Sequence, residues 1–175
     1  MSGNHLPYQL RPNKFIDRQL FIELLGRVIP DAGIEKYLYI SMGGRHLVDH
    51  RAVYKQLGVP HLFSFDGDGN IIERQNFNKP TGKAICEEML SGGLPNKIDE
   101  LLETFASAEH LIIWLDYTDP KSRLSQLQEL VEVLGKLQPC DVLRITLNAS
   151  VSSLEENTAD WRDNGFPSPQ MYWLN

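Results

Sequence analysis

Residues 37–66 constrain the fold of this chain more than any other stretch, because they alternate apolar runs with a glycine turn and a helical pattern. In order, the parts are an apolar run over 37–42, the turn Gly43-Gly44, a helical pattern over 45–57, and a second apolar run that ends in Asp66. Short runs rich in β-branched and aromatic residues, bounded by turn residues, indicate buried strands. The stretch therefore predicts a strand–helix–strand unit with a glycine turn after its first strand and an acid at the end of its second.

Units of this kind often bind nucleotides, and two interpretations of this one stay open. In a nucleotide-binding unit the glycines let the backbone approach the ligand, and the acid, here Asp66, accepts hydrogen bonds from ribose hydroxyls. In an ordinary unit the glycines only make the turn, and Asp66 caps the following helix. The sequence of the turn does not distinguish these two interpretations, because Ser41-Met42-Gly43-Gly44-Arg45 lacks the third glycine of G-x-G-x-x-G.

The composition is that of a soluble globular protein with one core: 175 residues, 42% apolar and 23% charged, with a net charge of −6. This acidic balance argues against broad adhesion to nucleic acids or membranes, although it is compatible with a local basic patch. Cys86 and Cys140 lie too far apart for a metal-binding spacing, so no metal site is expected. Without a secretory signal or an apolar run long enough to span a bilayer, the chain is expected to be cytoplasmic.

The strongest strand signal lies at 110–115, a run that is apolar on both faces and therefore predicts a central parallel strand. Asp116 follows it directly. In an open α/β sheet, ligands bind beyond the carboxyl ends of the strands, near the switch in strand order. We therefore expect Asp66, Asp116 and the turn Gly43-Gly44 to converge on one crevice. Helix capping is the plainer role for Asp116 and Asp119, and it is compatible with a site.

The rest of the chain predicts further helices and strands around this core. Helical patterns mark 15–29, 71–75, 95–105 and 122–137, and strand patterns mark 84–89 and 141–147. The helix over 122–137 is amphipathic, with an apolar stripe through Leu124, Leu127, Leu130, Val131 and Leu134. We predict one domain over residues 1–150, with a leader and helix in 1–30, followed by an irregular tail over 151–175.

A different chemistry is suggested by Asp66-Gly67-Asp68-Gly69, which is similar to the D-x-D-G loop of haloacid-dehalogenase-type phosphatases. In that family the first Asp attacks phosphorus and the second acts as acid and base. The family also needs a later acidic pair for magnesium and a lysine. Asp116, Asp119 and Lys121 are a poor substitute for these groups, so the phosphatase is the weaker alternative.

Several strings in combination resemble the bacterial "putative O-methyltransferase" family, which has the Rossmann-like methyltransferase fold. They are Tyr8-Gln-Leu-Arg-Pro-Asn-Lys14 with Asp17-Arg18, the turn Gly43-Gly44, Asp66 with the later Arg74-Gln-Asn-Phe-Asn-Lys-Pro80, and Trp114-Leu-Asp-Tyr117. The resemblance covers roughly residues 5–150. It implies an α/β three-layer sandwich, in which a mostly parallel sheet has helices on both faces.

The resemblance also implies S-adenosylmethionine (AdoMet) as the cofactor. Gly43 and Gly44 would lie under its methionine and ribose, Asp66 would hold the ribose hydroxyls, and Asp116 would line the methyl-transfer side of the pocket. The leader around 11–14 would close over the cofactor.

Catalysis by such an enzyme would be largely the alignment of an in-line displacement, because the sulfonium is already activated. A base is needed only if the acceptor must lose a proton. The candidates for that role are Asp116, Tyr117 and Asp119, and the residues do not select among them.

Two departures from the family pattern leave the activity open. An AdoMet site often has an acid at the end of its first strand, where this chain has Ser41 or Met42. Methyltransferase sheets usually continue past the fifth strand, whereas the residues after Asn148 do not resemble a helix and two strands. Missing C-terminal strands would leave an open sheet edge for a partner chain or a second copy to cover. A methyltransferase with an unknown acceptor is the leading hypothesis, and a non-catalytic binding or assembly protein with a degenerate pocket is the alternative.

Overall fold

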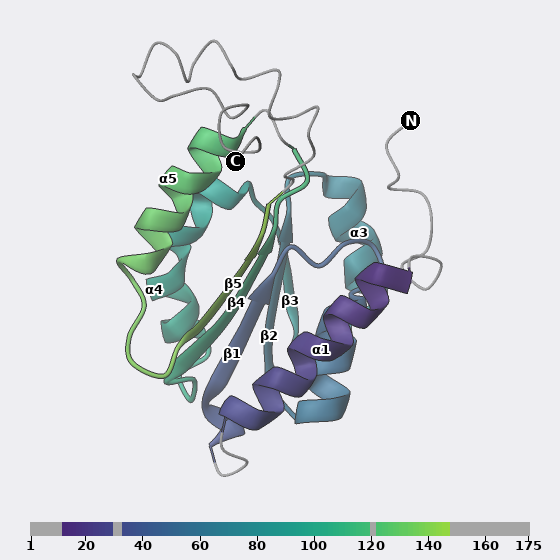
Figure 1. Ribbon diagram of the computed structural model, residues 1–175. Coiled ribbons are helices and arrows are strands. Elements are labelled where there is room, and N and C mark those ends of the chain that lie inside the picture. The colour runs from purple at the N-terminus through teal and green to yellow at the C-terminus, as the bar shows by residue number, and fades with distance from the viewer. Residues whose placement is uncertain (1–11, 30–32, 120–121, 148–175) are drawn as a thin grey trace, which may run out of the picture.

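The computed structural model describes residues 12–29, 33–119 and 122–147, in which strands and helices alternate (Figure 1). The described strands are β1 (Tyr37–Ser41), β2 (His61–Asp66), β3 (Ile85–Glu88), β4 (His110–Asp116) and β5 (Val142–Thr146). The described helices are α1 (Pro12–Val28), α2 (Val48–Ala52), α3 (Gly69–Phe77), α4 (Leu94–Thr104) and α5 (Arg123–Leu134), with the short η3 (Ile34–Lys36), η4 (Val53–Leu57) and η5 (Ser91–Gly93). This alternation is the pattern of an α/β protein.

The five described strands are all parallel and form one sheet in the order β3-β2-β1-β4-β5. β1 pairs with β4 although β2 and β3 come between them in the sequence, so the strand order reverses at this point. β1 is buried along its whole length and β4 in all but its end residues. This burial on both faces explains why the two strands have near-continuous apolar sequences.

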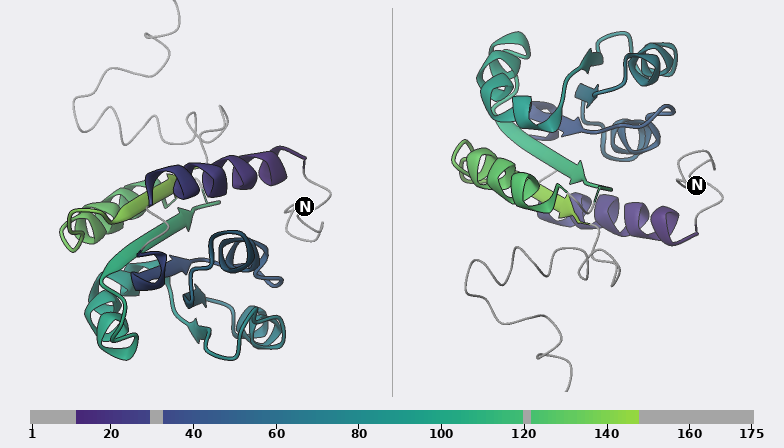
Figure 2. Two further views of the ribbon diagram at one scale, coloured as in Figure 1. Left: turned by 90° about the horizontal axis from the view of Figure 1, so that it is seen from below. Right: turned by 90° about the horizontal axis from the view of Figure 1, so that it is seen from above.

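Helices cover both faces of the sheet and make three layers, which Figure 2 shows from the two ends of the molecule. On one face Leu94 and Ile98 of α4 pack in a core cluster with residues of β1, β2 and β4. On the other face Phe21 and Leu25 of α1 pack in a second cluster that includes Trp114 of β4. The fold class predicted from the sequence is therefore confirmed.

Several helix boundaries differ from the prediction, and two of the differences have a local cause. The sequence predicts a helix from residue 15, but α1 begins at Pro12, since the fixed backbone angle of proline suits the first position of a helix. The sequence predicts a helix from residue 45, but α2 begins at Val48, because Leu47 before it takes a left-handed conformation with φ 47°. α3 extends to Phe77, beyond the predicted 71–75. The predicted tail over 151–175 lies outside the described residues.

The apolar stripe predicted on 122–137 forms, but most of it does not face the sheet. On α5 the buried residues are Gln126 and Val133. The stripe residues Leu124, Leu127, Val131 and Leu134 are exposed. Polar bonds turn the helix this way: Gln126 donates to the Asp119 carbonyl (2.8 Å), and Glu129 accepts from the Tyr117 hydroxyl (2.8 Å).

The glycine turn after β1 packs directly against β2 and α2. The Gly43 N–H donates to Ser64 Oγ at 3.2 Å. A Cβ at Gly43 would lie against Ser64 Oγ, 2.5 Å from a Leu47 methyl group and 2.7 Å from the His50 ring. Gly44 has a positive φ of 41°. Glycine is therefore required at the two positions for different reasons: close packing at Gly43 and a left-handed backbone at Gly44.

We predict that Gly43→Ala lowers the free energy of unfolding by about 1–3 kcal/mol, because the added methyl group overpacks the junction of β1, β2 and α2. Urea denaturation followed by tryptophan fluorescence measures this. Gly82→Ala is the matched control, since no heavy atom lies within 4 Å of its added Cβ. A Gly43→Ala protein as stable as Gly82→Ala would contradict the packing account.

Candidate functional site

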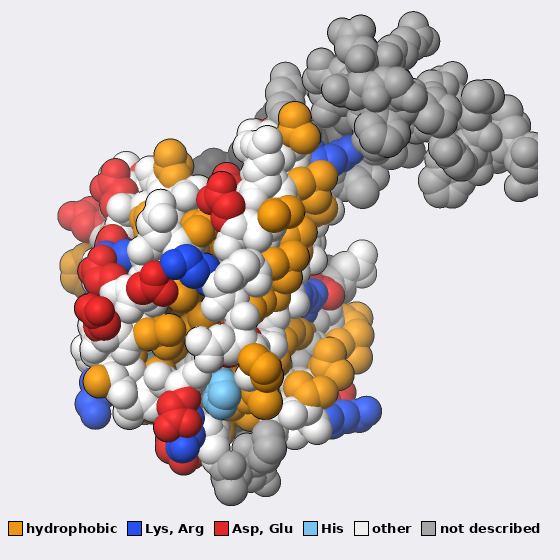
Figure 3. Space-filling view, turned by 90° about the vertical axis from the view of Figure 1, so that its left-hand side faces the viewer, with side chains coloured by type: hydrophobic (Ala, Val, Ile, Leu, Met, Phe, Trp, Pro, Cys, Tyr) orange, Lys and Arg blue, Asp and Glu red, His pale blue; other side chains and the backbone are white. Residues whose placement is uncertain are grey.

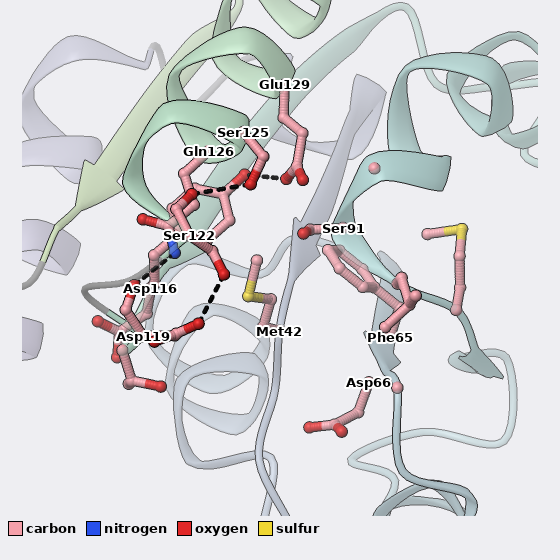
Figure 4. Close-up of a pocket in the computed structure, with 16 residues that line it drawn as sticks. Met42, Phe65, Asp66, Ser91, Asp116, Asp119, Ser122, Ser125, Gln126 and Glu129 are labelled. Atoms are coloured by element: carbon pink, nitrogen blue, oxygen red, sulfur yellow. Dashed lines mark hydrogen bonds between the residues drawn. The ribbon is translucent and has the colours of Figure 1, made fainter. Parts of the chain in front are cut away.

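A cavity of about 420 Å³ opens at the carboxyl ends of the strands (Figure 4). Its wall contains the ends of β2 and β4, the residues that follow β1 and β3, and the beginning of α5. This is the position at which a sheet with reversed strand order binds ligands, and the volume is within the range of small-molecule pockets. The site therefore lies where the sequence predicts a crevice.

Asp66 ends β2 and lines this cavity. Its Oδ1 accepts a hydrogen bond from the Asp68 N–H at 2.9 Å. Burial raises the pKa of Asp66 above its ordinary value, and the charge of Asp68 acts in the same direction, while the bond from the Asp68 N–H opposes them. A partly buried carboxylate at the end of the second strand has the position that holds ribose hydroxyls in nucleotide-binding α/β proteins.

The following helix is capped by Asp68, so the capping role that one interpretation gave to Asp66 is wrong. Asp68 Oδ1 accepts from the Asn70 N–H at 2.9 Å at the start of α3. This bond is the main cause that lowers the pKa of the exposed Asp68. Asp68 is therefore used to begin a helix, whereas Asp66 is left to face the cavity.

Asp116 ends β4 and lines the cavity together with Asp66. Its two carboxyl oxygens each accept a hydrogen bond from Lys14 Nζ at 2.8 Å. Lys14 lies in the first turn of α1, so this ion pair ties the N-terminal helix to the end of a central strand. That the leader around 11–14 closes over a cofactor stays a prediction: the structure places Lys14 beside Asp116, and Arg11 lies outside the described residues.

The loop after β4 is held against α5 by side-chain hydrogen bonds (Figure 4). Ser122 Oγ donates to Asp119 Oδ2 at 2.6 Å, and Gln126 donates to the Asp119 carbonyl. Tyr117 is buried and donates its hydroxyl to Glu129 at 2.8 Å. Burial, followed by this bond, raises the pKa of Tyr117 far above its ordinary value, so the phenol stays protonated at neutral pH.

The glycine turn lies beside the cavity rather than in its wall. Gly43 lines an adjoining hollow of only about 20 Å³, whose wall also includes Lys14. Met42 and Asp116 line both spaces, so the two adjoin. Gly44 is in the wall of neither.

A buried polar cluster lies beneath the glycine turn. Asp49 Oδ2 accepts hydrogen bonds from the Tyr39 hydroxyl (2.9 Å) and from Ser41 Oγ (2.7 Å). His50 Nε2 donates to the Phe63 carbonyl at 2.9 Å, while its Nδ1 lies 3.5 Å from Asp49 Oδ2. Burial opposes ionisation of Asp49, but His50 and Ser41 outweigh it and lower the pKa of Asp49 below its ordinary value. An ionised carboxylate therefore joins α2 to β1.

Sequence reasoning brings together Asp66, Asp116 and Tyr117 but misses two parts of the site. The wall from α5 is missed because Glu129 looks like an ordinary solvent-facing charge in an amphipathic helix. The buried cluster is missed because Asp49 stands in a helical stretch with other polar residues. Its one signal is its place, one residue before His50 in the first turn of the helix that follows the glycine turn.

The charge of the cavity suits a cationic ligand. Carboxylates of Asp66, Asp116, Asp119 and Glu129 line it, and its lining in the described part of the chain includes no lysine or arginine. Lys14 pairs with Asp116 from outside that lining, so the lining keeps an excess of negative charge although one carboxylate is neutralised. Met42 and other apolar side chains supply non-polar wall. In a partly enclosed site, such carboxylates attract a cation more strongly than they would in water.

The described ranges contain no group of three or more His, Cys, Asp or Glu side chains placed to hold a metal ion. No helix within those ranges is both long and apolar enough to cross a membrane.

Fold and cavity together define the class: an α/β protein with a Rossmann-like sheet and a small-molecule cavity at its switch in strand order. The chain belongs to a family described as "Putative O-methyltransferase", whose model matches residues 6–169. The family resemblance seen in the sequence is thereby confirmed. No curated protein matches the sequence.

We predict that Asp49→Asn lowers the free energy of unfolding by about 3 kcal/mol at neutral pH, because it removes a buried charge on which two hydroxyls and His50 converge. The folded-state pKa of Asp49 is depressed, so its stabilisation is present above the ordinary value of 3.8 and is lost as pH falls through the folded pKa. Urea denaturation at a series of pH values should show the two proteins converging in acid.

The control is Asp99→Asn, which removes one partner of an exposed ion pair with Lys136 and should change little. An Asp49→Asn protein that matches Asp99→Asn in stability would refute a structural role for the buried carboxylate.

Proposed function

We propose that this protein is an AdoMet-dependent O-methyltransferase that binds its cofactor in the 420 Å³ cavity. The observation that carries the proposal is that Asp66 and Asp116 line one space at the reversal of strand order, although 50 residues separate them in the sequence. Membership of the O-methyltransferase family supports the transfer of a methyl group. The methyl acceptor is unknown.

The residues present suit AdoMet in charge and in kind. AdoMet carries a sulfonium cation, and the described wall of the cavity is rich in carboxylates and has no basic side chain. Asp66 would accept hydrogen bonds from the ribose hydroxyls. Apolar groups such as Met42 and Phe65 would contact the uncharged parts of the ligand.

The glycine turn has a more limited part in this proposal than the sequence suggests. Gly43 is required by internal packing and reaches only the adjoining hollow, whose wall includes Lys14. Contact between the turn and the methionine end of AdoMet would need the Lys14 side chain to leave Asp116. We therefore assign cofactor binding mainly to Asp66 and Asp116. Gly43 and Gly44 would contact the cofactor only if the Lys14 side chain moved away from Asp116.

AdoMet supplies a methyl group that is already activated, so the chain must bind the two reactants, align them and exclude water from the site. Tyr117 is not suited to remove a proton, because its raised pKa and its bond to Glu129 keep it protonated. It can instead fix the end of β4, which carries Asp116, and the following loop, which carries Asp119. These two carboxylates stay the candidates for accepting a proton from an acceptor hydroxyl.

The alternative is a non-catalytic binding protein on the same fold with a degenerate pocket. A measurement of AdoMet binding is the first test between the two, because only the methyltransferase requires the cofactor. No observation favours the phosphatase, since Asp68 is engaged in capping α3.

We predict that isothermal titration calorimetry detects AdoMet binding and that Asp66→Asn weakens it about 10- to 100-fold, through the loss of hydrogen bonds to a charged acceptor. Asp99→Asn, an isosteric change on α4 at an exposed carboxyl, is the control and should bind as the wild type does. The proposal fails if AdoMet does not bind at millimolar concentration, or if both variants bind it equally.

The affinity for AdoMet should fall as the pH is lowered towards the pKa of Asp66. Burial raises that pKa, so the carboxylate gains a proton at a higher pH than a free aspartate would, and then no longer accepts both hydroxyl protons. Calorimetric titrations at several pH values test this, with Asp66→Asn as the reference. The dependence on Asp66 is excluded if the wild type and the variant weaken in parallel.

A further inference from the structure

α1 has apolar residues on an exposed side as well as on its buried side. Phe21, Ile22 and Leu25 face the core. On another side of the same helix, Ile16, Leu20, Leu24 and Val28 are each at least half exposed. A helix that is apolar on two sides normally has both of them covered.

α5 presents a second exposed apolar row, made by Leu124, Leu127, Val131 and Leu134. The spacing of three and four residues places them on one side of the helix. Glu129, which faces the cavity, lies on the opposite side. The row is therefore directed away from the cavity.

The edge of the sheet at β5 lies between these two rows. β5 pairs with β4 on one side, and no described strand pairs with its other side. The Thr146 carbonyl accepts from the Tyr117 N–H on the β4 side, so the backbone groups of Leu143 and Ile145 point to the open edge. Arg144 of β5 bonds to Asp17 of α1, which brings the side of α1 that carries Leu20 and Leu24 next to this edge.

We call the α1 row, the open edge of β5 and the α5 row the open-edge surface. Figure 3 shows it from the α5 side, with one row of apolar side chains running down α5 and a second along α1. Contiguous apolar patches of this kind on a protein surface mark interaction sites. Unpaired strand edges are also ready to pair with another strand.

The distribution of charge makes the open-edge surface suitable for burial against the same surface of a second copy. The chain carries a net charge of −6, which would oppose self-association elsewhere on its surface. The α1 side of the open-edge surface has Asp17 paired with Arg144, and Glu23 paired with Arg27. Arg144 also lies over the Trp114 ring at 4.1 Å, so it is turned inwards and away from the edge. Two copies would thus meet without bringing unpaired like charges together on that side.

We propose that the open-edge surface binds a second copy of this chain, with the two β5 strands antiparallel about a two-fold axis. Such an axis places α1 against α1 of the second copy on one face of the sheet, and α5 against α5 on the other. Apolar rows then meet apolar rows, and the open edges satisfy each other's backbone groups in one continuous sheet. An isologous dimer requires this self-complementarity.

Residues 148–156, which follow β5 directly, are a poorer occupant on sequence grounds. A strand that paired with β5 and packed on both rows would need a run rich in β-branched and aromatic residues. The sequence Asn148-Ala-Ser-Val-Ser-Ser-Leu-Glu-Glu156 has mostly small and polar residues instead.

Sedimentation velocity of the full chain over a wide concentration range tests the proposal. The wild type should dimerise, and Leu20→Glu and Val131→Glu should each raise the dissociation constant of the dimer by about 30-fold or more. Both residues are exposed in the single chain, so circular dichroism should show unchanged folding. Phe77→Glu, at an 83% exposed position on α3, which packs against β2 and β3 at the other end of the strand order, is the matched control and should leave dimerisation unchanged.

Hydrogen exchange of individual amides tests the strand pairing itself. In the dimer, the amides of Leu143 and Ile145 should exchange much more slowly than in monomeric Val131→Glu. A wild type that stays monomeric overturns the proposal, as does a dimer that the α1 and α5 variants leave intact. Amides of Leu143 and Ile145 that exchange equally fast in both proteins would exclude β5 pairing.

Discussion

The packing of the β1–α2 turn against β2 is the constraint on which the rest of the structure depends. Gly43 has no side chain, which lets its N–H reach Ser64 and lets Leu47 and His50 close over it. Asp49 then bonds back to Tyr39 and Ser41 on β1. These contacts fix the carboxyl ends of β1 and β2 relative to each other, and hence where Asp66 stands. Pairing of β1 with β4 adds Asp116 to the same edge.

The sheet and the two acidic strand ends could be predicted because both follow from local patterns. Buried parallel strands have apolar sequences, and a carboxylate directly after such a strand must lie at the carboxyl edge of the sheet. Asp66 and Asp116 were therefore placed correctly without knowledge of any contact between them. The beginning of α2 could not be predicted, because a left-handed Leu47 depends on the burial of its side chain rather than on its propensity.

Which side of α5 faces the sheet could not be predicted from the sequence for a similar reason. Its apolar stripe is visible in the sequence, but two hydrogen bonds with the residues after β4 select the side that meets the sheet: Gln126 donates to the Asp119 carbonyl, and Glu129 accepts from the Tyr117 hydroxyl. The same bonds make α5 a wall of the cavity and turn its leucines towards the open edge. Long-range polar contacts of this kind leave no periodic signal. The ion pair between Lys14 and Asp116 is another example, since its partners are 102 positions apart.

The central claim is that AdoMet occupies the cavity between the ends of β2 and β4, and the methyl signals of methionine test it most directly. The chain has four methionines, and of these Met42 and Met89 line the cavity. A protein labelled with ¹³C at its methionine methyl groups can be titrated with AdoMet and followed by NMR, with Met42→Leu and Met89→Leu assigning the two signals. The account predicts that both signals shift on binding. Signals of Met42 and Met89 that do not move, while AdoMet binds, would contradict it.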